Sequence, residues 1–147
     1  MSGLESLYQE LILDHSKRPE GKGLRGAEGD AGTADAHQRN PICGDEITLR
    51  VRVEDDRVAE LSWAGEGCSI SQASASMLTD LAVGKTREVV AELVAGFREA
   101  LRSRGAIALD EEVYGDAAAL SGVSRYVARV KCAMLAWVAL EDALLRA

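Results

Sequence analysis

The sequence is poor in cysteine, proline and aromatic residues, and it has no excess of basic residues. Its 147 residues include 3 Cys, 2 Pro, 2 His, 2 Trp, 3 Tyr and 1 Phe. Lysine and arginine together number 17 against 24 aspartates and glutamates, so the net charge is -7. Binding to nucleic acid or to an anionic membrane surface depends on clustered Lys and Arg. We therefore expect neither nucleic acid nor a membrane as a partner.

Two kinds of apolar segment are also missing. No apolar run approaches the roughly 18 residues that a membrane span needs. The first ten residues, MSGLESLYQE, lack the basic start and following apolar stretch of a secretory signal peptide. We therefore expect a cytoplasmic protein in a reducing compartment.

The three cysteines, Cys43, Cys68 and Cys132, are odd in number and far apart in the sequence. They cannot form a complete disulfide framework. In a reducing compartment such cysteines are buried apolar filler, metal ligands or reactive thiols. Composition alone leaves these three alternatives open.

The order of periodic segments predicts a single α+β domain over residues 1–147. The apolar spacing predicts helices over about 4–12, 70–81, 89–101 and 124–146, and strands over about 34–39, 47–53 and 58–63. Residues 103–123 show no periodicity and are expected to be irregular. Strands followed by helices favour a small antiparallel sheet of about three strands packed with helices.

Local signals refine these elements. The EDD triplet at 54–56 predicts the turn of a hairpin, and broken alternation over 58–61 predicts a β-bulge. Gly84 and Thr86 are placed to end one helix and to cap the next. His15 is expected to interact with the last carbonyls of the first helix.

The stretch NPICGDEI, residues 40–47, places Cys43 in the turn that enters the first strand of the hairpin. Asp45 follows two residues later, and residues i and i+2 of an extended chain point to the same side. A thiolate and a carboxylate can therefore converge on one point. Pro41 and Gly44 are suited to fix the turn and to give the backbone room.

Cys68 follows AGEG and precedes a predicted helix, where unpaired N–H groups and the helix dipole favour a thiolate. Cys132 lies inside the last predicted helix, from which it can face the edge of a sheet. Three soft ligands and the carboxylate of Asp45 make the four that a tetrahedral zinc requires. The spacing is not that of a zinc finger, so buried filler and a single reactive thiol remain alternatives.

Two cations next to Cys132 bear on this metal-site hypothesis. Three thiolates, one carboxylate and Zn²⁺ carry a net charge of -2 by formal count, and Lys131 and Arg129 are close enough in sequence to offset it. Arg129 also fits an ordinary solvated helix face. The serine-rich run GCSISQASAS has no histidine nearby in the sequence to activate a serine.

Four motifs carry a resemblance to a known family. LYQELILDHSKRPEGKG, NPICGDEITL, GEGCSISQASASMLTDLAVGKT and RVKCAMLAWVALEDAL together resemble the IscU/NifU N-terminal family of iron–sulfur cluster assembly proteins. The resemblance runs from about Leu4 to Leu144. It implies an α+β fold with a small antiparallel sheet. It also implies zinc held by the residues matching Cys43, Asp45, Cys68 and Cys132.

Two departures from IscU-type scaffolds indicate the branch of this family. Such scaffolds have a histidine before the third cysteine, where this chain has Lys131. The segment between Cys68 and Cys132 is also longer here, with the excess expected in 103–123. Both features resemble the SufU branch.

The SufU branch implies a sulfur relay. The pyridoxal-phosphate cysteine desulfurase SufS forms a persulfide, and the residue matching Cys43 accepts its outer sulfur for a downstream SUF cluster-assembly scaffold. One alternative is an IscU-type scaffold that assembles a transient [2Fe–2S] iron–sulfur cluster on the three cysteines and Asp45. Another is a zinc-stabilised domain that only binds partners. The role of 103–123, as part of a desulfurase-docking surface or a plain surface excursion, stays open.

Overall fold

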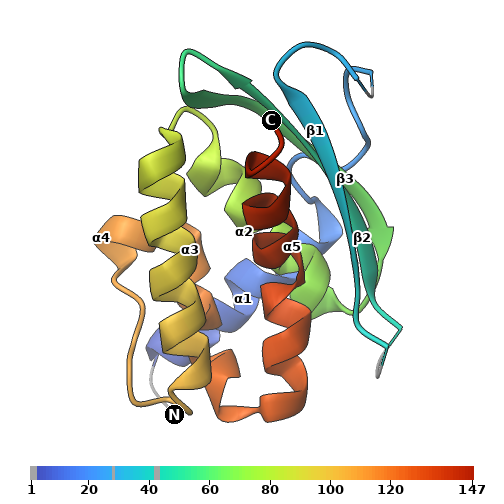
Figure 1. Ribbon diagram of the computed structural model, residues 1–147. Coiled ribbons are helices and arrows are strands. Elements are labelled where there is room, and N and C mark those ends of the chain that lie inside the picture. Colours follow the sequence, from blue (N-terminus) through green and yellow to red (C-terminus); the bar gives the residue numbers. More distant parts are fainter. Residues whose placement is uncertain (1–2, 28, 42–43) are drawn as a thin grey trace.

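A three-stranded antiparallel sheet lies against helices in the computed structural model, which describes residues 3–27, 29–41 and 44–147. The elements in chain order are α1 Gly3–Lys17, β1 Thr33–Arg39, β2 Glu46–Glu54, β3 Arg57–Glu66, α2 Ser69–Ala82, α3 Arg87–Arg102, α4 Glu111–Tyr114, the 3₁₀ helix η1 Gly115–Arg125 and α5 Val127–Leu144. Figure 1 shows α5 between α3 and the sheet. The predicted α+β fold is confirmed. No helix in the described part of the chain is long and apolar enough to cross a bilayer.

The sheet has the order β1-β2-β3. The alternation of apolar and polar side chains along its strands decides which side of the sheet faces the helices. Ile47, Leu49 and Val51 of β2 are buried, whereas the residues between them remain partly exposed. The turn between β2 and β3 holds Asp55 and Asp56 at positive φ, the backbone that a two-residue hairpin turn needs. This confirms the predicted hairpin.

The predicted bulge is confirmed on β3. Arg52 pairs with Glu60 and Val53 pairs with Val58, so Ala59 is an extra residue opposite β2. An extra residue bends the strand and increases its twist.

Helix α5 forms the centre of the molecule, because it packs against β1, β2, α2 and α3. Small buried side chains along it let its neighbours approach closely: Ala133, Ala136, Ala139 and Ala143. Trp137 stacks on Phe97 of α3, with ring centroids 3.8 Å apart and planes 3° from parallel. The hydroxyl of Ser74 on α2 donates to the carbonyl of Ala133 at 2.6 Å and accepts from Nε1 of Trp137 at 2.9 Å.

The prediction that residues 103–123 are irregular is wrong for most of the segment, which forms α4 and η1. Tyr114 explains why it is ordered. Its ring packs in tilted contact with Phe97 and Trp137, and its hydroxyl donates to the carbonyl of Leu93 at 2.9 Å. Gly96 makes room, since a Cβ there would lie 2.3 Å from the Tyr114 oxygen. The last helix begins at Val127 rather than at 124 because η1 runs to Arg125.

The prediction for His15 is also wrong, because its ring bonds to side chains of other elements. Nδ1 lies 2.6 Å from Oγ of Ser76 on α2, and Nε2 lies 2.9 Å from Oδ2 of Asp116 in η1. Ser76 also accepts from the backbone N–H of Glu20 at 2.8 Å. This is a serine–histidine–aspartate arrangement, but Ser76 is fully buried and no substrate can reach it. The network therefore holds α1, α2 and η1 together.

We expect His15→Ala to lower the free energy of unfolding by about 1–3 kcal/mol, because it removes both side-chain hydrogen bonds of a buried ring. His37 is exposed, contacts Thr48 and Glu46, and provides the matched control. His37→Ala should change the free energy by less than about 0.5 kcal/mol. Urea unfolding of both variants measures the difference, and equal losses would contradict a special role for His15.

A carboxylate of α2 is destabilised by its surroundings. Burial, followed by the charge of Glu20, raises the pKa of Asp80 above its ordinary 3.8, with Asp116 adding in the same direction. A raised pKa means that the folded state favours the neutral carboxyl.

Because the pKa of Asp80 is raised, we expect Asp80→Asn to increase the free energy of unfolding in a pH-dependent way. Deprotonation of Asp80 destabilises the folded protein as pH rises above 3.8, and the amide removes this penalty. We expect the variant to gain stability over the wild type at neutral pH and to lose that advantage near pH 3. Urea unfolding at both pH values tests this, and a gain of the same size at both would show that ionisation is not its cause.

Candidate metal centre

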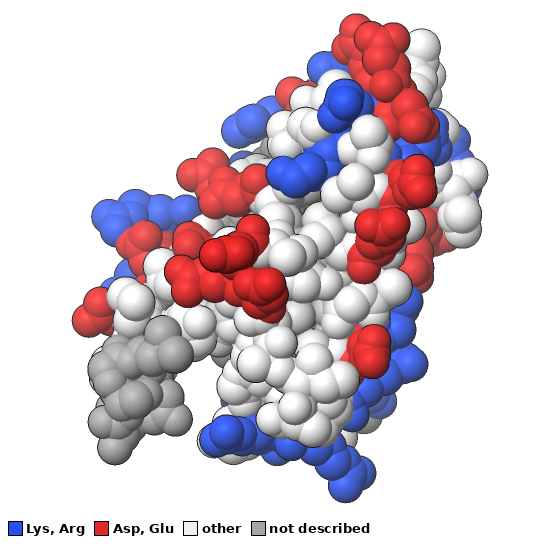
Figure 2. Space-filling model, turned by 90° about the vertical axis from the view of Figure 1, so that its left-hand side faces the viewer, with Lys and Arg blue, Asp and Glu red and all other residues white. Residues whose placement is uncertain are grey.

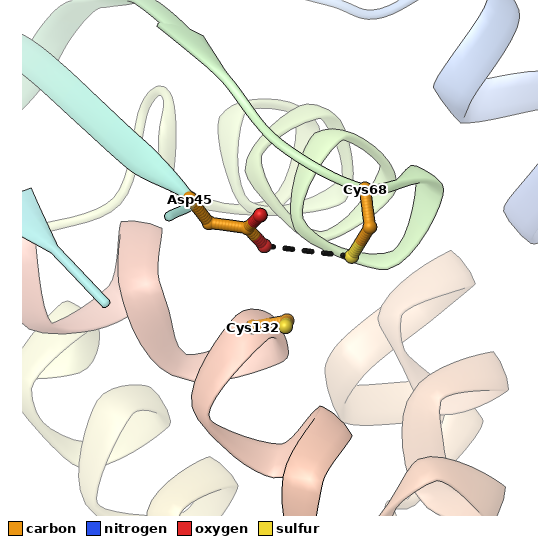
Figure 3. A group of neighbouring side chains, drawn as sticks. All are labelled: Asp45, Cys68 and Cys132. Atoms are coloured by element: carbon orange, nitrogen blue, oxygen red, sulfur yellow. Dashed lines mark hydrogen bonds between the residues drawn. The ribbon is translucent and has the colours of Figure 1, made fainter. Parts of the chain in front are cut away.

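Three potential metal ligands from separate parts of the chain meet at one point. Asp45 immediately precedes β2, Cys68 immediately precedes α2, and Cys132 lies on α5. One ligand atom from each lies within 4.8 Å of those of the other two. Figure 3 shows the three side chains pointing toward a common space. The fourth predicted ligand, Cys43, lies outside the described residues.

Asp45 is held by the backbone of the connection between β1 and β2. The N–H of Asn40 donates to the carbonyl of Asp45 at 2.7 Å, and the N–H of Gly44 donates to the carbonyl of Asn40 at 2.8 Å. Gly44 has a φ of 77°, which suits glycine. The Asp45 side chain is thereby turned inward, and the residue is only 4% exposed.

Cys68 occupies the N-cap position of α2 without using its side chain as a cap. Its carbonyl accepts from the N–H of Gln72 and from the hydroxyl of Ser71, while its thiol lies 3.5 Å from Oδ2 of Asp45. The thiol is therefore not used to cap the helix and lies free of the first turn of α2. This matches the helix start predicted from the AGEG run.

Gly67 provides the space in which Asp45 meets Cys68. A Cβ at this position would lie 2.9 Å from Cγ of Asp45 and 2.2 Å from Oγ of Ser71. The absence of a side chain at 67 is therefore what lets the carboxylate approach the helix start. The sequence pattern alone does not single out Gly67.

Cys132 is buried, with 1% exposure, and its thiol lies 3.9 Å from the carbonyl of Ala128. Its neighbours Lys131 and Arg129 are exposed and lie beside hollows on different sides of α5. In the described part of the chain, neither forms an ion pair. That they offset the charge of a metal site stays a prediction.

Cys68 also borders a hollow of about 840 Å³ between α1, η1 and the start of α5. Its wall is largely apolar and aromatic and carries two arginines; it includes Tyr8, Ile12, Ile70, Val123, Arg125, Tyr126 and Arg129. Tyr126 is 65% exposed. The sequence patterns do not single out Tyr8, Arg125 or Tyr126 as lining residues. The one local indication is that Tyr126 lies between Arg125 and Arg129, shortly before Cys132. The hollow makes Cys68 the accessible member of the cluster.

The donor set fits a thiophilic metal. Two thiols and one carboxylate suit zinc, for which thiolate, imidazole and carboxylate are the ordinary ligands. Thiolates also hold iron–sulfur clusters. The three side chains leave a tetrahedral ion one further ligand, so the centre is compatible with the predicted Cys43.

Comparisons with known proteins place the chain among iron–sulfur assembly proteins. The family model described as NifU-like N terminal domain matches residues 7–143. The chain is 40% identical to the iron–sulfur cluster assembly scaffold protein IscU of Streptococcus pyogenes serotype M1, over 99% of this chain and 87% of that protein. It is also 40% identical to the zinc-dependent sulfurtransferase SufU of Bacillus subtilis, over 95% of this chain and 90% of that one.

A solved structure shows the same fold. The crystal structure of FiSufU from Fervidobacterium islandicum AW-1 superposes with a TM-score of 0.81 at 31% identity. The match covers 97% of this chain and 99% of that one.

We expect the purified protein to bind zinc and Asp45→Ala to weaken this binding by at least about 100-fold, since even partners that only orient metal ligands contribute about 10–100-fold. The control is Glu46→Gln, which removes the neighbouring exposed carboxylate and should leave the affinity unchanged. Competition with a chromophoric chelator measures both variants. Unchanged affinity in Asp45→Ala would remove Asp45 from the ligand set.

Proposed function

The chain belongs to the family of NifU-like N-terminal domains, and on that premise we propose that it is a zinc-dependent sulfur acceptor in cytoplasmic iron–sulfur cluster assembly. Its sulfur comes from the persulfide of a cysteine desulfurase of the SufS type and passes to a downstream SUF scaffold. The observation that carries the proposal is the convergence of Asp45, Cys68 and Cys132 from three elements.

In this proposal Cys43, Asp45, Cys68 and Cys132 hold the zinc. Bound zinc keeps its thiol ligands deprotonated and ties the segments that carry them together. Asp45 contributes a harder donor than a thiolate, and soft thiolates are the stronger partners of zinc. A centre with one carboxylate is therefore more open to ligand exchange than one with four cysteines.

The proposed transfer is a thiol–persulfide exchange at Cys43. The Cys43 thiolate attacks the outer sulfur of the desulfurase persulfide, forming a new S–S bond as the old one breaks. The desulfurase cysteine leaves as a thiolate, and the outer sulfur with its proton stays on Cys43. No external oxidant or reductant is needed.

The surroundings of Cys68 support this role. The hollow beside it gives a donor segment a route to the centre, and its arginines Arg125 and Arg129 suit an anionic persulfide. Asp45 and Cys132 stay buried, so they can keep the site assembled while the donor enters.

A scaffold role is the second candidate, because the Streptococcus pyogenes relative of equal identity bears a scaffold name. Lys131 argues against it. Lysine replaces the histidine of IscU-type scaffolds, and its side chain is exposed whereas the adjacent Cys132 is buried. An exposed ammonium group is a poor ligand for a cluster held by thiolates.

We expect the wild-type protein to increase alanine production from cysteine by the SufS-type desulfurase of the same organism. Cys43→Ala should reduce this to the rate of the desulfurase alone, because the acceptor sulfur is missing. Glu46→Gln, an exposed change near the centre, should stimulate as the wild type does. Full stimulation by Cys43→Ala would refute the relay, and a brown protein with stable iron as isolated would favour the scaffold.

A further inference from the structure

A groove between α3 and α5 is lined by Lys131, the neighbour of Cys132 in the chain, but by none of the three candidate ligands. It encloses about 570 Å³ and has an apolar floor that includes Leu101, Val127, Val130, Met134 and Val138. Helices α3 and α5 run side by side along it (Figure 1). Val127 is 63% exposed, so part of the apolar surface of the groove is open to solvent.

The groove is basic although the protein carries a net charge of -7. Arg98, Arg102, Arg104 and Lys131 line it. Arg98 is neutralised, since its guanidinium bonds to both carboxylate oxygens of Glu141 at 2.8 and 3.2 Å. Figure 2 shows basic side chains along the lower edge of the molecule, below the acidic middle of that face.

The other three cations have no such partner. Within the described ranges, no carboxylate forms an ion pair with Arg102, Arg104 or Lys131, and all three side chains are exposed. Three uncompensated cations around an apolar floor attract a ligand that is acidic and partly apolar.

The groove continues toward the segment that carries Cys43. A second hollow of about 200 Å³ shares Lys131, Met134 and Val138 with it and extends to Asn40 and Pro41. Arg39 adds another cation at this end. The groove therefore leads from the end of α3 to the residues just before Cys43 in the chain, and it passes the helix turn that holds Cys132.

We propose that this α3–α5 groove docks an acidic segment with apolar side chains that belongs to the sulfur-donating desulfurase. This rests on the proposed function, because it names how the donor is positioned over the centre. The groove adjoins the hollow at Asn40 and Pro41 through Lys131, Met134 and Val138, so a donor seated in the groove lies next to the described residues that precede Cys43 in the chain. The hollow at Cys68 admits the persulfide, and the groove anchors the body that carries it.

The test compares two double variants with the same change in net charge. Arg102→Glu with Arg104→Glu reverses two charges in the groove. Arg18→Glu with Arg25→Glu reverses the charges of two exposed arginines that line neither the groove nor the second hollow. Isothermal titration of the purified SufS-type desulfurase gives the Kd of each. We expect the groove variant to raise Kd about tenfold or more and the control to stay within about twofold, since only the groove variant loses two cations that face the proposed ligand.

Two further measurements separate the electrostatic from the apolar contribution to binding. The effect of the groove variant should shrink in 0.5 M salt, because exposed charges are screened. Val127→Ser removes exposed apolar surface without emptying the core, and it should raise Kd severalfold at either salt concentration. At saturating concentration the groove variant should stimulate the desulfurase to the wild-type maximum.

Binding and turnover separate the failure of docking from the failure of the relay. Equal Kd values for the groove variant and its control overturn the docking proposal and leave the relay intact. Groove-dependent binding together with full stimulation by Cys43→Ala overturns the relay and supports docking. Tighter groove-dependent binding of duplex DNA, or of vesicles containing anionic lipid, than of the desulfurase also overturns the docking proposal.

Discussion

The buried hydroxyl of Ser74 fixes how α2 lies against α5, and the candidate centre depends on that arrangement. It donates to the carbonyl of Ala133 and accepts from Nε1 of Trp137, so both of its bonds cross between the helices. Cys68 begins α2 and Cys132 precedes Ala133 on α5. The distance between the two thiols therefore follows from a helix contact set by small side chains and two hydrogen bonds in a fully buried place.

The third member of the cluster, Asp45, lies directly before strand β2, which packs against the same helix α5. The backbone hydrogen bonds that join Asn40 to Asp45 and to Gly44 hold Asp45 just before that strand, with its carboxylate buried. Gly67 leaves the space that the carboxylate occupies. Each of the three side chains thus lies on, or directly before, an element that packs in the core of the molecule.

The local parts of this structure could be predicted from the sequence. The alternation of apolar and polar residues predicts β2, and the EDD triplet predicts the hairpin turn. Thr86 caps α3 as predicted, since its side chain accepts a hydrogen bond from the N–H of Val89. The placement of Cys68 at a helix start also follows from local signals, since glycines and helical periodicity meet there.

The nonlocal parts could not be predicted in this way. His15 bonds to Ser76 and Asp116, which are 61 and 101 residues away, so no local pattern shows its partners. Helix α4 and η1 owe their order to Tyr114, whose ring reaches aromatic residues of two other helices. The basic groove between α3 and α5 likewise exists only once those helices pack together.

Cys68 provides the partly exposed thiol of the candidate centre, Asp45 and Cys132 provide two buried ligands, and the basic α3–α5 groove is the proposed docking surface on another side of α5. The central claim is that Asp45, Cys68 and Cys132 share one zinc with Cys43. X-ray absorption at the zinc edge of the purified protein tests this most directly, because it counts sulfur neighbours and lighter ones separately. The account predicts three sulfur atoms and one oxygen in the wild type, and two sulfur atoms in Cys43→Ala. Two sulfur atoms in the wild type, or no change in the variant, would contradict it.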